Sequence, residues 1–175
     1  MRKLMILCLL MAMQFNSFSQ TDSVAANVKD VESIDAIIQS LYDVISGGAG
    51  ETRNWNRMRT LFLPEAKMIA TGTNPAGEIV KRVMTVEDYI ARSGPVLEKN
   101  GFFEKELFRK QEVFGRIAHC FSAYDSRRTL ADKAPFMRGI NSIQLYNDGK
   151  RWWIVSIFWQ SESKEVPLPK EYLPH

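Results

Sequence analysis

Apolar residues near the start of the chain recur at three- and four-residue steps, the spacing of a helix with one buried face. The run begins after Asp30, which can cap a helix, and it ends at the glycine-rich segment 46–50. Its members are Val31, Ile34, Ile37, Ile38, Leu41, Tyr42 and Ile45. The pattern predicts one amphipathic helix that spans these residues.

Two further helices are expected in the first half. A short one starts near Asn54 and stops at Pro64, because proline cannot continue a helix. Thr85 caps the next helix, with Asp88 three residues on as an acidic form of the capping box. Gly94-Pro95 is expected to interrupt that helix, so that 96–99 form either a separate turn or a kinked extension.

The other segments are typical of strands. Segments 66–71 and 78–83 predict a strand pair around a glycine-rich turn. Segment 102–127 is too long for one strand and is expected to fold back at Gly115.

Two strand-like segments close the pattern, 137–147 and 151–160. They flank Asn147-Asp148-Gly149-Lys150, which has the Asp-Gly pair of tight hairpins. Strands that follow one another in this way predict a twisted antiparallel sheet with an apolar face, and the upstream helices cover that face. The fold class is therefore α+β.

The first 19 residues have the order of a secretory signal peptide. Two basic residues precede the apolar run 4–13, which is too short for a permanent membrane anchor, and small residues follow at a cleavage site. Cleavage leaves Gln20 first, so the predicted location is periplasmic or secreted, with no membrane anchor in the mature form. One domain, 30–161, follows, and then an extended tail, 162–175.

Charge and cysteine content exclude several functions. The leader contains two cations and no acid, so its removal lowers the formal net charge from +3 to about +1 and weakens the case for nucleic-acid binding. Cys120 is then the one remaining cysteine, which excludes an internal disulfide. The chain has no Cys-x-x-Cys, no histidine pair at ligand spacing and no glycine-rich phosphate loop, so neither a metal nor a cofactor is predicted.

The order of these elements resembles the nuclear transport factor 2-like superfamily, and its small SnoaL-like bacterial members in particular. Leu61-Phe62-x-Pro-x-Ala is similar to the link between second helix and first strand in those proteins, and Thr85-Val86-Glu87-Asp88-Tyr89 to the start of their third helix. The strand motifs that carry the resemblance are Phe103-Glu104, Gly115-x-x-Ala118, Ser122-x-Tyr124, Arg138-Gly139-Ile140-Asn141 and Trp152-Trp153-Ile154. The resemblance covers 30–161.

The resemblance implies a curved antiparallel sheet wrapped around three helices, a cone-shaped barrel with one apolar pocket. It also implies a homodimer through the outer face of the sheet. The last two strands are apolar on both faces, which agrees with a second cover. Isomerases, dehydratases, epoxide hydrolases, cyclases and binding modules share this fold, so function has to be argued from the site.

Steroid isomerases of the superfamily use an aspartate base near the end of the first strand. The corresponding position here is Ala70, whose methyl group cannot abstract a proton. Their first-helix tyrosine corresponds approximately to Tyr42, which is then expected in the core or in the pocket wall. The resemblance therefore disfavours isomerase chemistry of that type.

His119 and Asp125 are the candidate acid–base residues, because alternation puts them on the same face of their strand. If that face lines the cone, His119 lies in the pocket with Asp125 nearer the rim. If the opposite face does, with Ser122 and Tyr124, then His119 is an interface or surface residue.

A pair of carboxylates is also possible at this sheet. Folding back at Gly115 brings Asp125 opposite Glu104 or Lys105. Two close carboxylates can share a proton and raise one pKa. The favoured alternative is a solvated ion-pair cluster at the sheet edge.

The second and third helices must lie across the concave sheet, so their apolar residues and the inward strand residues are expected to share one cavity. Arg138 and Asn141 are expected at its mouth, where they could hold a carboxylate or carbonyl. The predicted ligand-binding residues are Tyr42, Trp55, Met58, Phe62, Tyr89, Phe108, Tyr124, Arg138, Asn141 and Trp159.

The sequence therefore predicts an exported protein that binds a small, mostly apolar molecule without catalysis. The alternative is a lyase, isomerase or hydrolase that uses His119 or Asp125 as acid or base. A third class, a purely structural or interaction module, would lack a pocket with a buried polar group.

Overall fold

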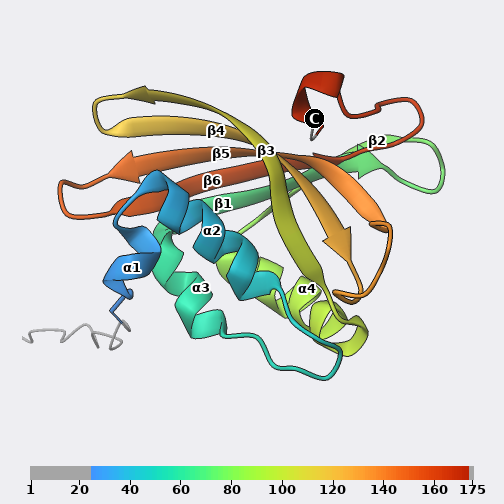
Figure 1. Ribbon diagram of the computed structural model, residues 1–175, viewed down its shortest axis with the longest axis horizontal. Coiled ribbons are helices and arrows are strands. Elements are labelled where there is room, and N and C mark those ends of the chain that lie inside the picture. Colours follow the sequence, from blue (N-terminus) through green and yellow to red (C-terminus); the bar gives the residue numbers. More distant parts are fainter. Residues whose placement is uncertain (1–24, 174–175) are drawn as a thin grey trace, which may run out of the picture.

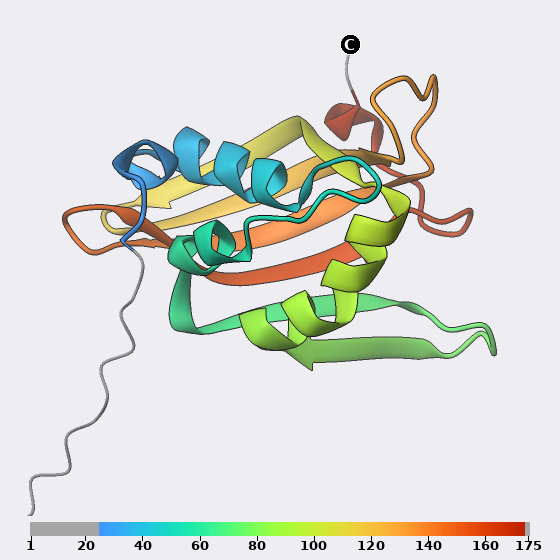
Figure 2. The same cartoon turned by 90° about the horizontal axis from the view of Figure 1, so that it is seen from below.

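The computed structural model describes residues 25–173, in which helices gather along one side of a curved six-stranded sheet (Figures 1 and 2). The helices are α1 (Val28–Val31), α2 (Ile34–Ile45), α3 (Trp55–Leu61) and α4 (Val86–Asn100). None of the helices in this described part is long and apolar enough to cross a membrane. The predicted signal peptide lies outside the described residues.

The strands are β1 (Phe62–Thr73), β2 (Ile79–Met84), β3 (Phe103–Phe114), β4 (Ile117–Arg127), β5 (Met137–Asn147) and β6 (Trp152–Ser161). Their order across the sheet is β2-β1-β6-β5-β4-β3. All neighbours are antiparallel except β1 and β6, which run parallel. The α+β fold with its curved sheet is as predicted, and the one parallel pair makes the sheet mixed.

Local turn and cap signals gave the correct element boundaries in several places. Gly115 turns β3 into β4 with φ 57°, and Gly149 turns β5 into β6 with φ 96°. Asn54 caps α3. Thr85 and Asp88 form the reciprocal capping box of α4.

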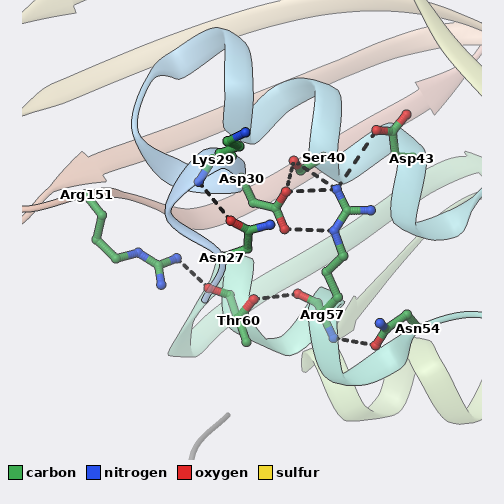
Figure 3. Close-up of polar contacts among 9 residues, drawn as sticks. All are labelled: Asn27, Lys29, Asp30, Ser40, Asp43, Asn54, Arg57, Thr60 and Arg151. Carbon is green, nitrogen blue, oxygen red and sulfur yellow. Dashed lines mark hydrogen bonds and ion pairs between the residues drawn. The ribbon is translucent and has the colours of Figure 1, made fainter. Parts of the chain in front are cut away.

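The predicted cap at Asp30 is wrong. Ser33 caps α2 by accepting from the Ala36 amide at 3.0 Å. Asp30 lies in α1, only 6% exposed, where its carboxylate accepts from Arg57 at 2.8 and 3.0 Å and from Ser40 at 3.1 Å (Figure 3). The Arg57 guanidinium also holds the pKa of Asp30 below its usual value. This carboxylate therefore ties α1 to α2 and α3 instead of starting a helix.

The expected separate turn after Gly94-Pro95 is also wrong, because α4 continues through Pro95 to Asn100 as the alternative, an extension of the helix, required. The lost backbone hydrogen bond is offset by tertiary packing. Trp55 lies against Gly94, where an added Cβ would meet its ring at 3.1 Å, and its indole N–H donates to Glu98 at 3.0 Å. Leu97 is buried. The second half of the helix is thus held in place from outside.

Pro64 does not end α3 either. The helix stops at Leu61 and β1 starts at Phe62, so that Pro64 lies within the strand. The strand therefore begins four residues before the predicted start at Ala66. The change from helix to strand without a loop fixes α3 at the end of the sheet.

The C-terminal segment is not a strand, as predicted, but it does more than follow the surface. Lys170–Tyr172 form a 3₁₀ turn whose Tyr172 is buried. Its ring packs edge-on against Phe108 and Phe121, with centroid distances of 5.8 and 5.6 Å. The segment thereby covers the part of the outer sheet face that β3 and β4 form.

Candidate functional site

A cavity of about 200 Å³ lies between α2 and α4 on one side and the inner face of the sheet on the other. Its wall is mainly aliphatic and aromatic. Tyr89 and Trp159 meet edge to face at 6.3 Å between ring centroids. The lining residues are Leu41, Tyr42, Ile45, Met68, Tyr89, Ser93, Leu97, Phe102, Glu104, Tyr124, Met137, Asn141, Ile157 and Trp159.

Among these lining residues, Glu104 alone has an acidic or basic side chain. It is the second residue of β3, and its backbone N–H donates to Ser46 Oγ at 3.0 Å, which ties the strand to the end of α2. Its carboxylate accepts from Ser126 Oγ at 2.8 Å. The side chain is half-buried, and the surface that it exposes faces the cavity.

Burial raises the pKa of Glu104 to about 7. Hydrogen bonds from Ser126 and Asn141 pull the pKa down, and the negative charge of Asp125 pushes it further up. The carboxyl group is therefore poised to gain or lose a proton near neutral pH, as a general acid or base must.

A directed chain of hydrogen bonds runs beside Glu104. Ser122 Oγ donates to a Glu106 oxygen at 2.5 Å, so the Ser122 oxygen must accept from the Tyr42 hydroxyl at 2.7 Å. The Tyr42 oxygen in turn accepts from Asn141 Nδ2 at 3.1 Å. Tyr42 thus directs its proton away from the cavity.

Arg109 closes this chain on the α2 side. It makes an ion pair with Asp35, and its Nε lies 3.7 Å from Glu106. The negative charge of Glu106 is therefore matched by a cation, unlike that of Glu104. The direction of the chain is fixed by this charged end.

The other tyrosines of the wall are held neutral. Burial raises the pKa of Tyr124 to about 12 and also raises that of Tyr89 and Tyr42. The Tyr124 hydroxyl lies 3.3 Å from Ser161 Oγ, and Ser161 Oγ donates to the Met137 sulfur at 3.3 Å. Either hydroxyl can donate in the Tyr124–Ser161 pair, because a thioether sulfur is a weak acceptor and does not fix the Ser161 proton.

Five of the predicted ligand-binding residues come together in the cavity: Tyr42, Tyr89, Tyr124, Asn141 and Trp159. The other five do not line it. Met58 and Phe62 are buried in the core, and Trp55 packs against α4. Phe108 lies under Tyr172 on the outer face. Arg138 pairs with Glu162 at 2.8 Å in a separate surface hollow.

The predicted position of His119 in the pocket is wrong. Neighbours along β4 alternate, and Tyr124 lines the cavity while Ser122 bonds Tyr42, so His119 faces the other way. Its ring lies 3.0 Å from Ser142 Oγ and packs beside Phe121. The residue is part of the outer sheet face.

Asp125 shares that outer face and does not reach the cavity either. It lies opposite Lys105 and Arg138 in the sheet and pairs with Arg127 at 3.0 Å. The pairing with Lys105 is one of the two predicted registers. The favoured interpretation, a solvated ion-pair cluster, holds only in part, for the Arg127 pair, because Asp125 is buried and its charge raises the pKa of Glu104. No acid–base role in the cavity follows for Asp125.

The sequence pattern singled out Glu104 only as a possible carboxylate neighbour of Asp125, and not as a residue of the cavity. In the sheet Glu104 pairs with Ser126, on the inner face with Ser122 and Tyr124, because the register shifts between Glu106 and Phe108. Counting back from Gly115 without that shift pairs Glu104 with Arg127, on the opposite face. The hairpin pattern alone therefore could not predict that Glu104 points inward.

No family model matches the chain, and no curated protein matches it by sequence. Solved structures do resemble it. An NTF-2 like protein of unknown function from Silicibacter pomeroyi is 16% identical, with a TM-score of 0.51, over 75% of this chain and 94% of its own.

Two proteins with a cystatin-like fold are similar in the same way. One from Nostoc punctiforme is 10% identical, with a TM-score of 0.56, over 81% of this chain and 97% of its own. One from Caulobacter vibrioides is 11% identical, with a TM-score of 0.54, over 77% and 90%. The chain therefore has the nuclear transport factor 2-like fold. The finer resemblance to SnoaL-like members stays a prediction.

Proposed function

We propose that this protein binds a small, mostly apolar molecule in the cavity between α4 and the sheet, with a polar group of the ligand directed at Glu104 and Asn141. The observation that carries the proposal is a single uncompensated carboxyl group in an otherwise aromatic and aliphatic wall. Such a wall with a few convergent polar groups is typical of a ligand site. The cavity is smaller than the roughly 300–1,000 Å³ of most drug-sized sites, so the ligand is small.

Filling the cavity from α4 tests this proposal. Ser93→Trp places a large ring where a small side chain lines the wall, so binding of small aromatic probes such as indole and 4-ethylphenol should be lost. Saturation-transfer NMR of the probes measures this. Arg92→Trp is the matched control, because Arg92 is exposed on the same helix. Equal probe signals from Ser93→Trp and wild type, with both folded, would show that the probes bind elsewhere.

Catalysis is the second candidate function, and one observation favours it. The raised pKa of Glu104 suits proton transfer near neutral pH, whereas His119 and Asp125 lie outside the cavity. A lyase or isomerase of this type would use Glu104 as its acid or base. Its turnover should rise or fall around pH 7 and be lost in Glu104→Gln; a turnover that Glu104→Gln keeps would exclude Glu104 from the chemistry.

Export and dimerisation remain part of the proposal, on the grounds given by the sequence. The outer sheet face still exposes Phe158 and Tyr146, beyond the area that Tyr172 covers. We expect a mature N-terminus at or near Gln20 and a dimer by light scattering at tens of micromolar, an order-of-magnitude choice for ordinary dimers. An intact Met1 on protein from its own host would count against export, and a monomeric mass would count against the dimer.

A further inference from the structure

The charges around the cavity are one-sided. Its lining contains one carboxylate, that of Glu104, and no lysine, arginine or histidine. Within residues 25–173, no basic nitrogen lies within 4.0 Å of that carboxylate, whereas Asp30, Asp125 and Glu162 each have an arginine partner. Buried carboxylates are normally paired, so Glu104 lacks a counter-charge that the fold supplies elsewhere.

Aromatic rings surround the same space. Tyr42, Tyr89, Phe102, Tyr124 and Trp159 contribute rings from α2, α4, the start of β3, β4 and β6. The face of an aromatic ring is negative, and rings grouped around a small space attract organic cations. The aromatic wall, like the carboxylate, therefore favours a positively charged ligand.

The hydrogen-bond directions also favour a ligand that carries the donors or a positive charge. Tyr42 directs its proton at Ser122, and the Tyr124 hydroxyl is hydrogen-bonded with Ser161. Asn141 donates to Tyr42 and also hydrogen-bonds the Glu104 carboxylate. These groups therefore offer a ligand mainly hydrogen-bond acceptors, the lone pairs of their oxygens. A carboxylate or phosphate would find no cation here.

From these three observations we propose that the ligand is a small organic cation, an ammonium with an apolar body, held by Glu104 within the aromatic rings. The inference deepens the proposed function and rests on it. The bound cation would be the missing partner of the Glu104 carboxylate.

Binding of a cation should then depend on pH. Below neutral pH Glu104 is protonated, and the cation must displace that proton. The other titratable groups that face the cavity beside Glu104 are Tyr42, Tyr89 and Tyr124, and Asp125 acts on Glu104 through its charge from the outer side of the sheet. Asp125 is paired with Arg127, and burial keeps the tyrosines neutral well above this range. Affinity is therefore expected to rise from pH 5.5 to pH 8.

A pair of probes with the same shape separates charge from apolar contact. Phenyltrimethylammonium and tert-butylbenzene differ in one atom, nitrogen against carbon, and the quaternary cation does not titrate. At pH 8 we expect the cation to bind at least about tenfold more tightly than the hydrocarbon. We also expect it to bind about thirtyfold more tightly at pH 8 than at pH 5.5, because pH 5.5 lies about 1.5 units below the pKa of Glu104 and each unit of proton competition corresponds to a factor of ten. Competition NMR or calorimetry measures both ratios.

Glu104→Gln should bring both ratios close to one, while Glu112→Gln, on the same strand but exposed, should leave them unchanged. Equal affinity of the two probes, or a pH-independent affinity of the cation for the wild type, would overturn the cation inference and leave apolar binding standing. If neither probe binds the wild-type protein at millimolar concentration, both proposals fail. The two wild-type comparisons hold even if a variant misfolds.

Discussion

Methionine in place of Arg53 is expected to lower the free energy of unfolding by about 3–5 kcal/mol, because a buried hydrogen-bonding hub would leave several groups unpaired. Arg53 is only 4% exposed. Its Nε donates to the Ile45 carbonyl at 3.1 Å, Nη1 to that of Glu51 at 2.6 Å, and Nη2 to those of Gly47 and Leu97 at 2.6 and 3.3 Å.

These carbonyls lie at the end of α2, in the loop that follows it and near the end of α4, where the helix itself offers no partner. One guanidinium therefore joins α2 and α4, the two helices that line one side of the cavity. Lysine should recover only part of the loss, since one ammonium cannot reach carbonyls on several sides.

Urea unfolding checks this prediction, with Arg92→Met as the control. Arg92 is exposed on α4, so its replacement should change the free energy of unfolding by less than about 0.5 kcal/mol. A loss below about 1 kcal/mol for Arg53→Met would mean that water replaces the guanidinium at these carbonyls.

Local signals in the sequence were sufficient where one residue type decides the backbone. Gly115 and Gly149 have positive φ, and Thr85 with Asp88 closes a capping box, so these boundaries followed directly. Pro95 led to a wrong expectation because the backbone hydrogen bond that it removes is a local effect. The contacts of Trp55 that offset this loss come from 40 residues earlier in the chain. The parallel neighbours β1 and β6 are distant in sequence as well.

The inner face of β4 could not be predicted for a similar reason. Its two faces have comparable apolar content, with Cys120 and Tyr124 on one and Phe121 and Ala123 on the other. The outer face can contain an apolar residue such as Phe121 because Tyr172, some fifty residues later in the chain, packs on it. Half of the predicted binding set still reached the cavity. Helix periodicity placed Tyr42 and Tyr89, and the β5–β6 hairpin placed Asn141 and Trp159, independently of β4, whereas Tyr124 lies on β4 itself.

The second large effect is expected from Glu104→Gln, which should stabilise the protein at pH 8 and change little at pH 5. The folded pKa of Glu104, about 7, lies above the usual glutamate value of 4.5. The folded state therefore binds more protons than the unfolded state between these values, and the free energy of unfolding falls as pH rises through this window. The fall is complete above the folded pKa.

The expected size follows from the same shift. At 1.36 kcal/mol for each pKa unit, the upper limit is about 3 kcal/mol, reduced because part of the carboxyl faces the cavity. Urea unfolding of both proteins at pH 5, 6, 7 and 8 measures it. Other groups that titrate in this range are common to the two proteins, so the difference between their curves isolates Glu104, and Glu112→Gln should run parallel to wild type.

A constant difference between Glu104→Gln and wild type across this range would show that the carboxyl is solvated and has no raised pKa. If the difference grows with pH as expected, the wild-type fold keeps a destabilising carboxylate at neutral pH that a neutral amide of the same shape would relieve. Residues that destabilise the fold in this way are typically retained where function requires them. The stability curve thus tests, without any ligand, whether the cavity is built around an unpaired negative charge.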